Sequence, residues 1–173
     1  MHKSRLEYER YAALGYVKVV FHEDSGGYLV IHPAHGQNEW EENKTIGRML
    51  TELGDAVVLL PNSKERPSPD ALRNGEEWEF KTIQAFTLKN AIQNALRKGK
   101  TQASNILCFI NMRYAIENIT LGIHNAVKFD REGLISNISI LFQDGQLIEM
   151  TRQEVSNRMF IRKFYEKTKE DGD

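Results

Sequence analysis

The chain has 173 residues, of which 40% are hydrophobic and 27% are charged. These values are ordinary for a soluble globular protein, and the length suits one domain with one sizeable core. The net charge of −1 excludes a generally basic nucleic-acid-binding protein, so any polyanion would have to bind a local patch.

Neither a membrane span nor an export signal is expected. No apolar run approaches the roughly 18 residues of a transmembrane helix, and the charged start of the chain lacks the apolar core of a secretory signal. The single cysteine, Cys108, lies in an apolar run and is interpreted as a buried hydrophobic residue. We therefore expect a cytoplasmic protein with no membrane partner and no internal disulfide.

The first 37 residues are expected to form an extension to the main domain. Residues 3–14 predict a helix, and residues 16–21 and 28–32 predict an antiparallel hairpin that forms an accessory layer. His32 and His35 lie three residues apart in a loop, a spacing that could bind a transition metal. Because no cysteine or acid cluster adjoins them, loop polarity is the better interpretation.

A helix is predicted from Glu39 to Leu53, with a buried stripe at Ile46, Met49, Leu50 and Leu53. Glu42 lies one turn before Ile46 on that stripe. A carboxylate that points inward near a helix start is costly unless it is paired, so Glu42 either caps backbone amides or joins a site with later acids. Glu41 is the alternative, because the helix phase is uncertain by one residue.

The central prediction concerns a hairpin within residues 67–83. Asn74-Gly75 predicts a two-residue type I′ turn, and counting back from it places Asp70 directly opposite Glu79, with Lys81 on the same face. Carboxylates in that position have Cβ atoms about 4.5–5.5 Å apart and repel each other. Either Lys81 or a divalent cation would offset the repulsion; Mg²⁺ or Mn²⁺ suits two carboxylates, and Zn²⁺ is possible. The alternative is a surface hairpin with solvated charges.

The second half of the chain predicts alternating strands and helices. A helix from Leu88 to about Lys98, a strand over 105–111, a helix over 114–128, a hairpin over 138–148 and a helix from 151 to 167 follow in order. Residues 78–83, the first of these helices and the strand after it should form a right-handed βαβ unit. Val57 to Leu60 is predicted as a strand buried on both faces.

A basic patch closes the helix that ends near Lys98. Its candidate nucleic-acid contacts are Arg97, Lys98, Lys100 and, just before the next strand, Gln102. The alternatives are a favourable interaction of the cations with the helix dipole and a loop-capping role for the Gln102 amide. A second basic segment, over residues 152–169, is more simply read as a solvated terminal helix.

Pro69-Asp70, followed after eight residues by Glu79-Phe80-Lys81, resembles the Asp…Glu-x-Lys signature of the PD-(D/E)xK nuclease superfamily. The setting adds to the resemblance: a preceding helix with Glu42, a buried strand, and Lys100 to Asn105 leading into another strand. In this order, residues 38 to 150 resemble the tRNA-cleaving C-terminal toxin domains of contact-dependent growth inhibition (CdiA-type) proteins and their relatives on phages and conjugative elements.

The resemblance implies an α/β, restriction-endonuclease-like domain over residues 38–173, with a mixed central sheet of about four or five strands and helices on both faces. It implies a metal-dependent nuclease in which Glu42, Asp70 and Glu79 hold the metal and Lys81 assists catalysis. RNA, and tRNA in particular, is favoured over DNA, and an immunity protein is a possible partner. The alternatives are a catalytically inactive nucleic-acid-binding or assembly protein of a mobile element, and a DNA endonuclease of the same fold.

Overall fold

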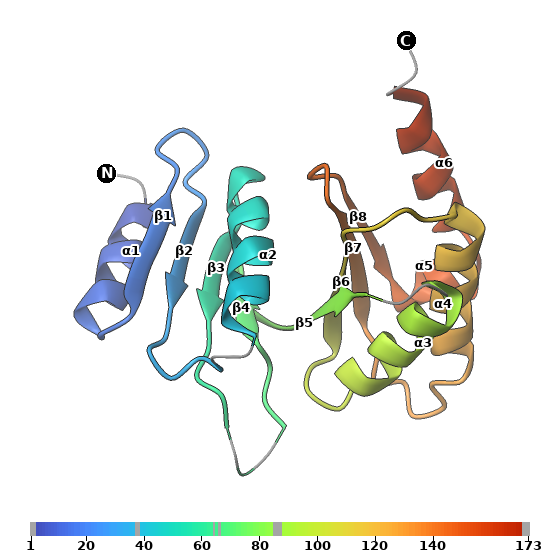
Figure 1. The fold of residues 1–173 in the computed structure, drawn as a ribbon, viewed down its shortest axis with the longest axis horizontal. Coiled ribbons are helices and arrows are strands. Elements are labelled where there is room, and N and C mark those ends of the chain that lie inside the picture. The colour runs from blue at the N-terminus through green and yellow to red at the C-terminus, as the bar shows by residue number, and fades with distance from the viewer. Residues whose placement is uncertain (1–2, 37–38, 64, 66, 85–87, 171–173) are drawn as a thin grey trace. The chain divides into compact units, whose positions relative to one another are not determined.

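The computed structural model describes residues 3–36, 39–63, 65, 67–84 and 88–170 (Figure 1). It divides into two compact units, Met1–Phe80 (unit 1) and Lys81–Asp173 (unit 2), and each is described by itself. The division that we expected after residue 37 stays a prediction. None of the described helices combines the length and apolar character that crossing a bilayer requires.

Unit 1 contains two helices and a sheet that begins with the predicted antiparallel hairpin. Its elements are α1 (Lys3–Ala13), β1 (Val17–Phe21), β2 (Tyr28–Ile31), α2 (Trp40–Glu52), β3 (Ala56–Leu59), β4 (Ala71–Arg73) and the part of β5 (Glu76–Ile83) up to Phe80. β2 also pairs in parallel with β3, and α2 connects the two strands. Because all four residues of β2 are buried, the hairpin belongs to the sheet rather than to an accessory layer.

The two helices of unit 1 cover opposite faces of its sheet. On one face, Tyr8 of α1 packs against Tyr28, with ring centroids 5.7 Å apart. On the other face, Gly47 of α2 lies so close to Leu29 that an added Cβ would be 2.9 Å from the Leu29 Cδ1. Since neighbouring residues of a strand point to opposite faces, the helices lie on either side of β2. Unit 1 thus has a helix on each face of its sheet, and one of them, α1, belongs to the predicted N-terminal extension.

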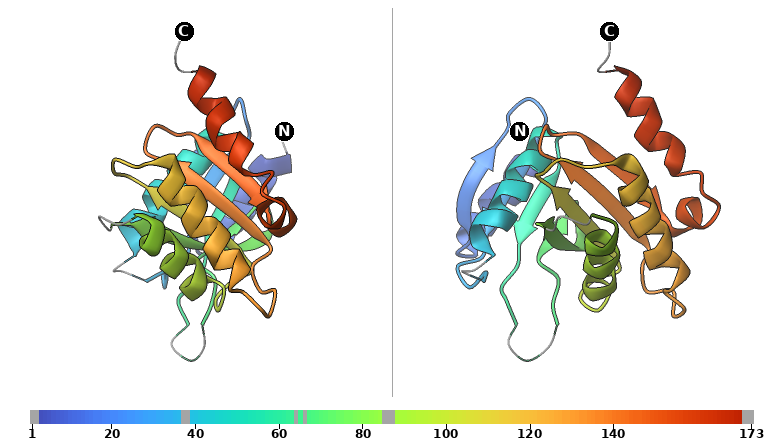
Figure 2. Two further views of the ribbon diagram at one scale, coloured as in Figure 1. Left: turned by 90° about the vertical axis from the view of Figure 1, so that its right-hand side faces the viewer. Right: turned by 45° about the vertical axis from the view of Figure 1, so that its right-hand side comes forward.

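Unit 2 has its described helices packed around one apolar core. Its elements after the end of β5 are α3 (Leu88–Gly99), β6 (Asn105–Ile110), α4 (Ile116–Lys128), β7 (Asn137–Phe142), β8 (Leu147–Thr151), α5 (Arg152–Ser156) and α6 (Ile161–Glu170). β6 and β7 are parallel, β7 and β8 are antiparallel, and α3 and α4 lie side by side (Figure 2). The core includes Cys108, where burial raises the pKa of the thiol to about 12, as expected for a small buried side chain.

The described strands lie in the order β1 to β8 in one mixed sheet, in which β5 and β6 are neighbours. The α/β class is therefore confirmed, but the expectation of four or five strands is wrong. Two features explain the larger number. The N-terminal hairpin joins the sheet through the β2 and β3 pairing, and the C-terminal hairpin adds β8 beside β7.

Candidate functional site

The hairpin between β4 and β5 forms as predicted. Asn74 and Gly75 have φ values of 53° and 86°, which is the conformation that a type I′ turn requires at both central positions. The predicted register is confirmed by the pairs Ala71 with Trp78, Leu72 with Glu77, and Arg73 with Glu76.

Polar contacts hold this hairpin against the start of β3. The Arg73 Nε donates to the Asp55 Oδ2 at 2.6 Å, and the Asn74 Nδ2 donates to the Asp55 Oδ1 at 2.7 Å. The Ala56 N–H in turn donates to the Asn74 Oδ1 at 2.9 Å. The Asp55 carboxylate thus binds both the strand end and the turn, which fixes the hairpin that carries the candidate acids.

One further step along the same register brings Asp70 opposite Glu79. Asp70 is 6% exposed and Glu79 is 0% exposed, so both carboxyl groups are buried. The Phe80 N–H donates to the Asp70 Oδ2 at 2.9 Å, and the Leu60 N–H donates to the Asp70 backbone oxygen at 2.9 Å. Asp70 is therefore fixed between β3 and β5, beside a second buried acid. The alternative of a hairpin with solvated charges does not describe these two residues.

Lys81 follows Glu79 by two residues on β5, so strand alternation places both side chains on one face. The side chain is half-buried. Burial raises the pKa of the Cys108 thiol, and the positive charge of Lys81 offsets part of that rise. The charge of Lys81 therefore acts on the buried part of β6.

A buried histidine and a buried asparagine lie at the carboxyl end of the parallel strands β2 and β3. The His35 Nδ1 lies 2.6 Å from the Leu60 backbone oxygen, and the His35 Nε2 lies 3.0 Å from the Asn43 Nδ2. A carbonyl oxygen only accepts, so Nδ1 carries the proton and Nε2 accepts from the asparagine. His35 thus ties α2 to the residue that follows β3, and both of its ring nitrogens are engaged in these contacts.

The His35 contact is linked to Asp70 through a single residue, Leu60. Leu60 accepts from His35 through its oxygen and donates to Asp70 through its nitrogen. Ligands of open α/β sheets bind at the carboxyl ends of strands, which is where these residues meet. Sequence reasoning treated His35 as a polar loop residue and missed Asn43. The available signal was that Asn43 precedes Ile46 and Leu50 at helical spacing.

Glu42 does not have the inward position that we expected. The buried face of α2 consists of Asn43, Ile46, Gly47, Leu50 and Thr51, whereas Glu41 and Glu42 are exposed in its first turn. Small residues define the buried face because they let the helix approach the sheet closely. Leu53, which we expected on the buried stripe, is 52% exposed. The phase prediction is wrong, although a role for Glu42 in binding stays a prediction.

Asp70 and Glu79 form the candidate donor set for a divalent ion. Among the described residues, no group of three or more His, Cys, Asp or Glu side chains is placed to hold a metal. Asp70 and Glu79 supply two carboxylates, and the Asp70 Oδ2 already accepts from the Phe80 N–H. Mg²⁺ commonly binds through one or two carboxylates and keeps several waters, whereas catalytic Zn²⁺ usually takes three protein ligands. The pair therefore fits Mg²⁺ or Mn²⁺ better than Zn²⁺.

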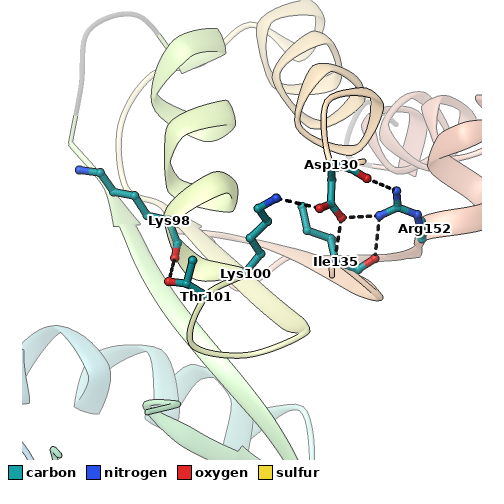
Figure 3. Close-up of polar contacts among 6 residues, drawn as sticks. All are labelled: Lys98, Lys100, Thr101, Asp130, Ile135 and Arg152. Carbon is teal, nitrogen blue, oxygen red and sulfur yellow. Dashed lines mark hydrogen bonds and ion pairs between the residues drawn. The ribbon is translucent and has the colours of Figure 1, made fainter. Parts of the chain in front are cut away.

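The predicted basic patch at the end of α3 is divided by its contacts. Arg97 and Lys98 are exposed, and Gln102 is half-buried. The Lys100 ammonium instead lies 2.8 Å from the Asp130 Oδ1, and the side chains of this pair are 18% and 1% exposed. Figure 3 shows the Lys98 side chain pointing away from this ion pair. Lys100 thus has a structural partner, which a phosphate would have to replace.

Asp130 is the centre of a buried network in unit 2 (Figure 3). Its Oδ2 accepts from the Arg152 Nη1 at 2.5 Å and from the Ile135 N–H at 2.9 Å. Burial acts to raise the pKa of Asp130, but the hydrogen bonds from Ile135, Lys100 and Arg152 together lower it below the usual value. The network joins the ends of α3 and α4 to the start of α5.

One family profile matches part of the chain. Residues 66–147 match the profile of the family described as "Contact-dependent growth inhibition CdiA C-terminal domain", which is 82 of the 173 residues counted inclusively. Among solved structures, the "CdiA-CT/CdiI toxin and immunity complex from Burkholderia pseudomallei" is similar, with 16% identity and a TM-score of 0.44 over 69% of this chain and 92% of that chain. No curated protein matches.

The matched residues include Asp70, Glu79 and Lys81 and leave out Glu42. PD-(D/E)xK membership stays a prediction, because the matched profile is described by its role in growth inhibition and not by that superfamily. The match over residues 66–147 supports a domain similar to the toxin domains of contact-dependent growth inhibition, as the resemblance of the sequence predicted.

Proposed function

We propose that this chain is a metal-dependent nuclease toxin of the PD-(D/E)xK type that hydrolyses phosphodiester bonds, with RNA and in particular tRNA as the favoured substrate. One observation carries the proposal. Asp70, directly before β4, and Glu79 on β5 are buried acids, with Lys81 two residues after Glu79, inside the segment that matches the toxin family. Like charges placed together in a protein interior are costly, so this arrangement is typical of a functional site.

The two acids would bind Mg²⁺ or Mn²⁺ through their carboxylate oxygens, with waters completing the shell. The ion would supply the positive charge that activates a water and neutralises the phosphate. The Phe80 N–H holds the Asp70 carboxylate in place, which prepares one ligand oxygen before the ion arrives. Lys81 would orient the attacking water or stabilise the negative charge that develops on the phosphate oxygens.

Other residues enter the proposal with less structural support. Glu42 is a proposed third ligand, and Arg97, Lys98, Lys100 and Gln102 are proposed contacts to nucleic acid. Glu42→Gln and Glu41→Gln form a matched pair, because both residues are exposed in the first turn of α2. A loss of Mn²⁺ affinity in Glu42→Gln alone would support the ligand role. Equal affinity in both variants would remove Glu42 from the site.

An immunity protein is the proposed protein partner, on the basis of the family resemblance. Such a partner would protect the producing cell by binding the toxin. Co-expression provides the measurement: growth arrest by the parent chain should disappear when the protein encoded beside it is expressed as well. Growth arrest that persists would argue against that partner.

The nuclease proposal is tested by incubating the purified chain with total RNA, purified tRNA and plasmid DNA, each with Mg²⁺, Mn²⁺, Zn²⁺ or EDTA. We expect cleavage of RNA with Mg²⁺ or Mn²⁺ and none in EDTA. Asp70→Ala and Glu79→Ala should abolish cleavage, whereas the exposed Asp24→Asn should retain it. Equal cleavage by the parent and Asp70→Ala would overturn the assignment. Cleavage of plasmid alone would identify a DNA endonuclease.

A further inference from the structure

A groove of about 710 Å³ lies in unit 1 between α1 and the face of the sheet formed by β2, β3 and β4. Val58 and Leu72 line it from the sheet, and Tyr11 and Leu14 line it from the helix. Leu14 is 63% exposed. The volume falls within the range of about 300–1,000 Å³ that is typical of ligand sites. The groove therefore offers an accessible apolar surface beside the helix.

Two cations at this groove differ from their neighbours. Arg5 is paired with Glu9 at 3.5 Å and with Glu23 at 2.6 Å, on the same helix and the adjoining loop. Lys3 and Arg10 line the groove, are exposed, and make no ion pair with any residue that the structure describes. The positive charges of Lys3 and Arg10 are therefore available to a ligand.

One acid also lines the groove. The Glu7 carboxylate accepts a hydrogen bond from the Tyr28 hydroxyl at 3.3 Å. The charged residues of the lining are thus Lys3, Arg10 and Glu7, two positive charges and one negative, which leaves a net charge of +1. On a chain whose net charge is −1, this local excess favours an anionic ligand.

The groove lies on the face of the sheet that carries Glu79. Leu72 lines the groove and pairs with Glu77, and strand alternation places Glu79 on the same face as Glu77. Asp70 precedes Leu72 by two residues, which corresponds to about 7 Å along an extended strand. A chain-like ligand in the groove could therefore continue to the two buried acids within unit 1.

We propose that this groove binds a single strand of the nucleic acid that the proposed nuclease cleaves, an inference that rests on the proposed function. Lys3 and Arg10 contact phosphates, and Tyr11 and Leu14 contact the sugars and bases. Such contacts bind strands with little sequence preference. A polyanion fits better than a protein partner because Lys3 and Arg10 form no ion pair within the described part of the chain, while the adjoining Arg5 is paired with Glu9 and Glu23. The helix that supplies them lies outside the segment matched by the toxin family.

The proposal is tested by titrating a fluorescein-labelled oligouridine with the full chain in EDTA, where the strand is not cleaved, at several salt concentrations. The variant Lys3→Gln/Arg10→Gln is compared with Arg48→Gln/Arg131→Gln, which removes two exposed cations elsewhere. We expect the groove variant to bind roughly tenfold more weakly. The slope of log affinity against log salt should decrease by about 1.4, since each lost phosphate contact to a single strand contributes about 0.7. The control should match the parent.

A second matched pair tests the apolar wall without removing a cation. Leu14→Glu places a carboxylate in the groove, and Leu53→Glu places one at another exposed leucine, the two parent side chains being 63% and 52% exposed. Both variants should fold, because neither leucine is buried. Leu14→Glu should weaken strand binding several-fold, and Leu53→Glu should leave it close to the parent value.

The outcomes separate the groove from the nuclease. If the parent cleaves RNA but both groove variants bind the strand as their controls do, the groove proposal is wrong, the nuclease proposal stands, and the groove faces a protein instead. If the parent cleaves nothing with any metal but both groove variants lose binding, the groove is supported and the nuclease proposal fails. A parent chain that does not bind the oligouridine overturns the groove proposal whatever it cleaves.

Discussion

Two buried acid clusters in this chain differ in how their charge is balanced. In unit 2, Asp130 is held by two cations and a backbone N–H, from Lys100, Arg152 and Ile135. In unit 1, Asp70 lies opposite Glu79, another buried acid, and accepts a hydrogen bond from the Phe80 N–H. The first cluster sets one acid against two cations, whereas the second sets two buried acids opposite each other.

The difference separates a structural role from a functional one. A buried carboxylate that meets enough cations is satisfied by the fold and has no need of a ligand. Two adjacent buried carboxylates gain more from a cation that arrives from solution. Asp130 should therefore contribute to stability and contribute little to catalysis, while Asp70 and Glu79 should do the reverse. The following variants test that division.

The largest expected effect is on stability. Asp130→Asn removes the negative charge that faces Lys100 and Arg152, and should lower the free energy of unfolding by about 3 kcal/mol, the low end for a broken buried ion pair because Arg152 remains partly exposed. Urea unfolding followed by circular dichroism provides the measurement. Asp24→Asn is the matched control at an exposed site and should change little. A loss below 0.5 kcal/mol, on the order of an exposed substitution, would contradict a structural role for Asp130.

The next effect is on catalysis. Lys81→Ala should lower turnover about a hundredfold, the usual scale for the loss of a positioned charge, and leave Mn²⁺ affinity largely intact. Asp70→Ala should lose both activity and Mn²⁺ affinity. Calorimetric titration beside the nuclease assay separates the two roles, with the exposed Lys128→Ala as the control. Unchanged turnover in Lys81→Ala would exclude the proposed mechanism.

A smaller effect compares two acids of unit 1 in metal-free buffer. Asp70→Asn should raise the free energy of unfolding by up to about 1 kcal/mol, because it relieves the repulsion with Glu79 while an amide oxygen can still accept from Phe80. Asp55→Asn should lower it by about 1 kcal/mol, because Arg73 and Asn74 lose a charged acceptor. Thermal unfolding in EDTA tests whether the signs are opposite. The same sign for both variants would mean that the Asp70 and Glu79 pair is not strained.

The smallest effect concerns pH. The bonds to Asp130 hold its pKa below the usual value, so the folded state keeps this carboxylate charged at a pH where the unfolded chain already binds a proton. The resulting stability is complete above the unfolded pKa of about 3.9 and is lost as the pH falls through the lower folded-state pKa. The difference in unfolding free energy between the parent and Asp130→Asn should therefore shrink below about pH 4. A constant difference would assign the stabilisation to something other than this ionisation.

The same comparison shows what the sequence could predict. Asp70 and Glu79 were found because a local turn determines their pairing: Asn74-Gly75 sets the register, and counting does the rest. The Asp130 network was missed because its members are separated by 30 residues on one side and 22 on the other. No local pattern relates residues so distant, and only the packing of α3, α4 and α5 brings them together.

The α2 helix illustrates a different limit. Its periodic apolar residues predicted the element but gave the wrong phase, because the buried face includes Asn43, Gly47 and Thr51. Gly47 is buried to allow close approach to Leu29, and Asn43 is buried to bind His35. Apolar periodicity cannot detect residues that are buried for their small size or for a specific hydrogen bond. The error of one residue moved the predicted inward position from Asn43 to Glu42.

The turn that sets the register also governs the chemical ageing of the protein. In an Asn-Gly pair, the glycine backbone nitrogen can attack the asparagine side-chain carbonyl carbon and release ammonia, which forms a cyclic succinimide. Water then opens the succinimide to an aspartate or isoaspartate linkage. In the folded chain the Asn74 amide is held by Asp55 and Ala56, which restrains that attack. Unfolded molecules lack the restraint, so a preparation that unfolds during storage would accumulate isoaspartate at this turn. A mass-spectrometric record of that linkage would therefore report the unfolding history of the sample.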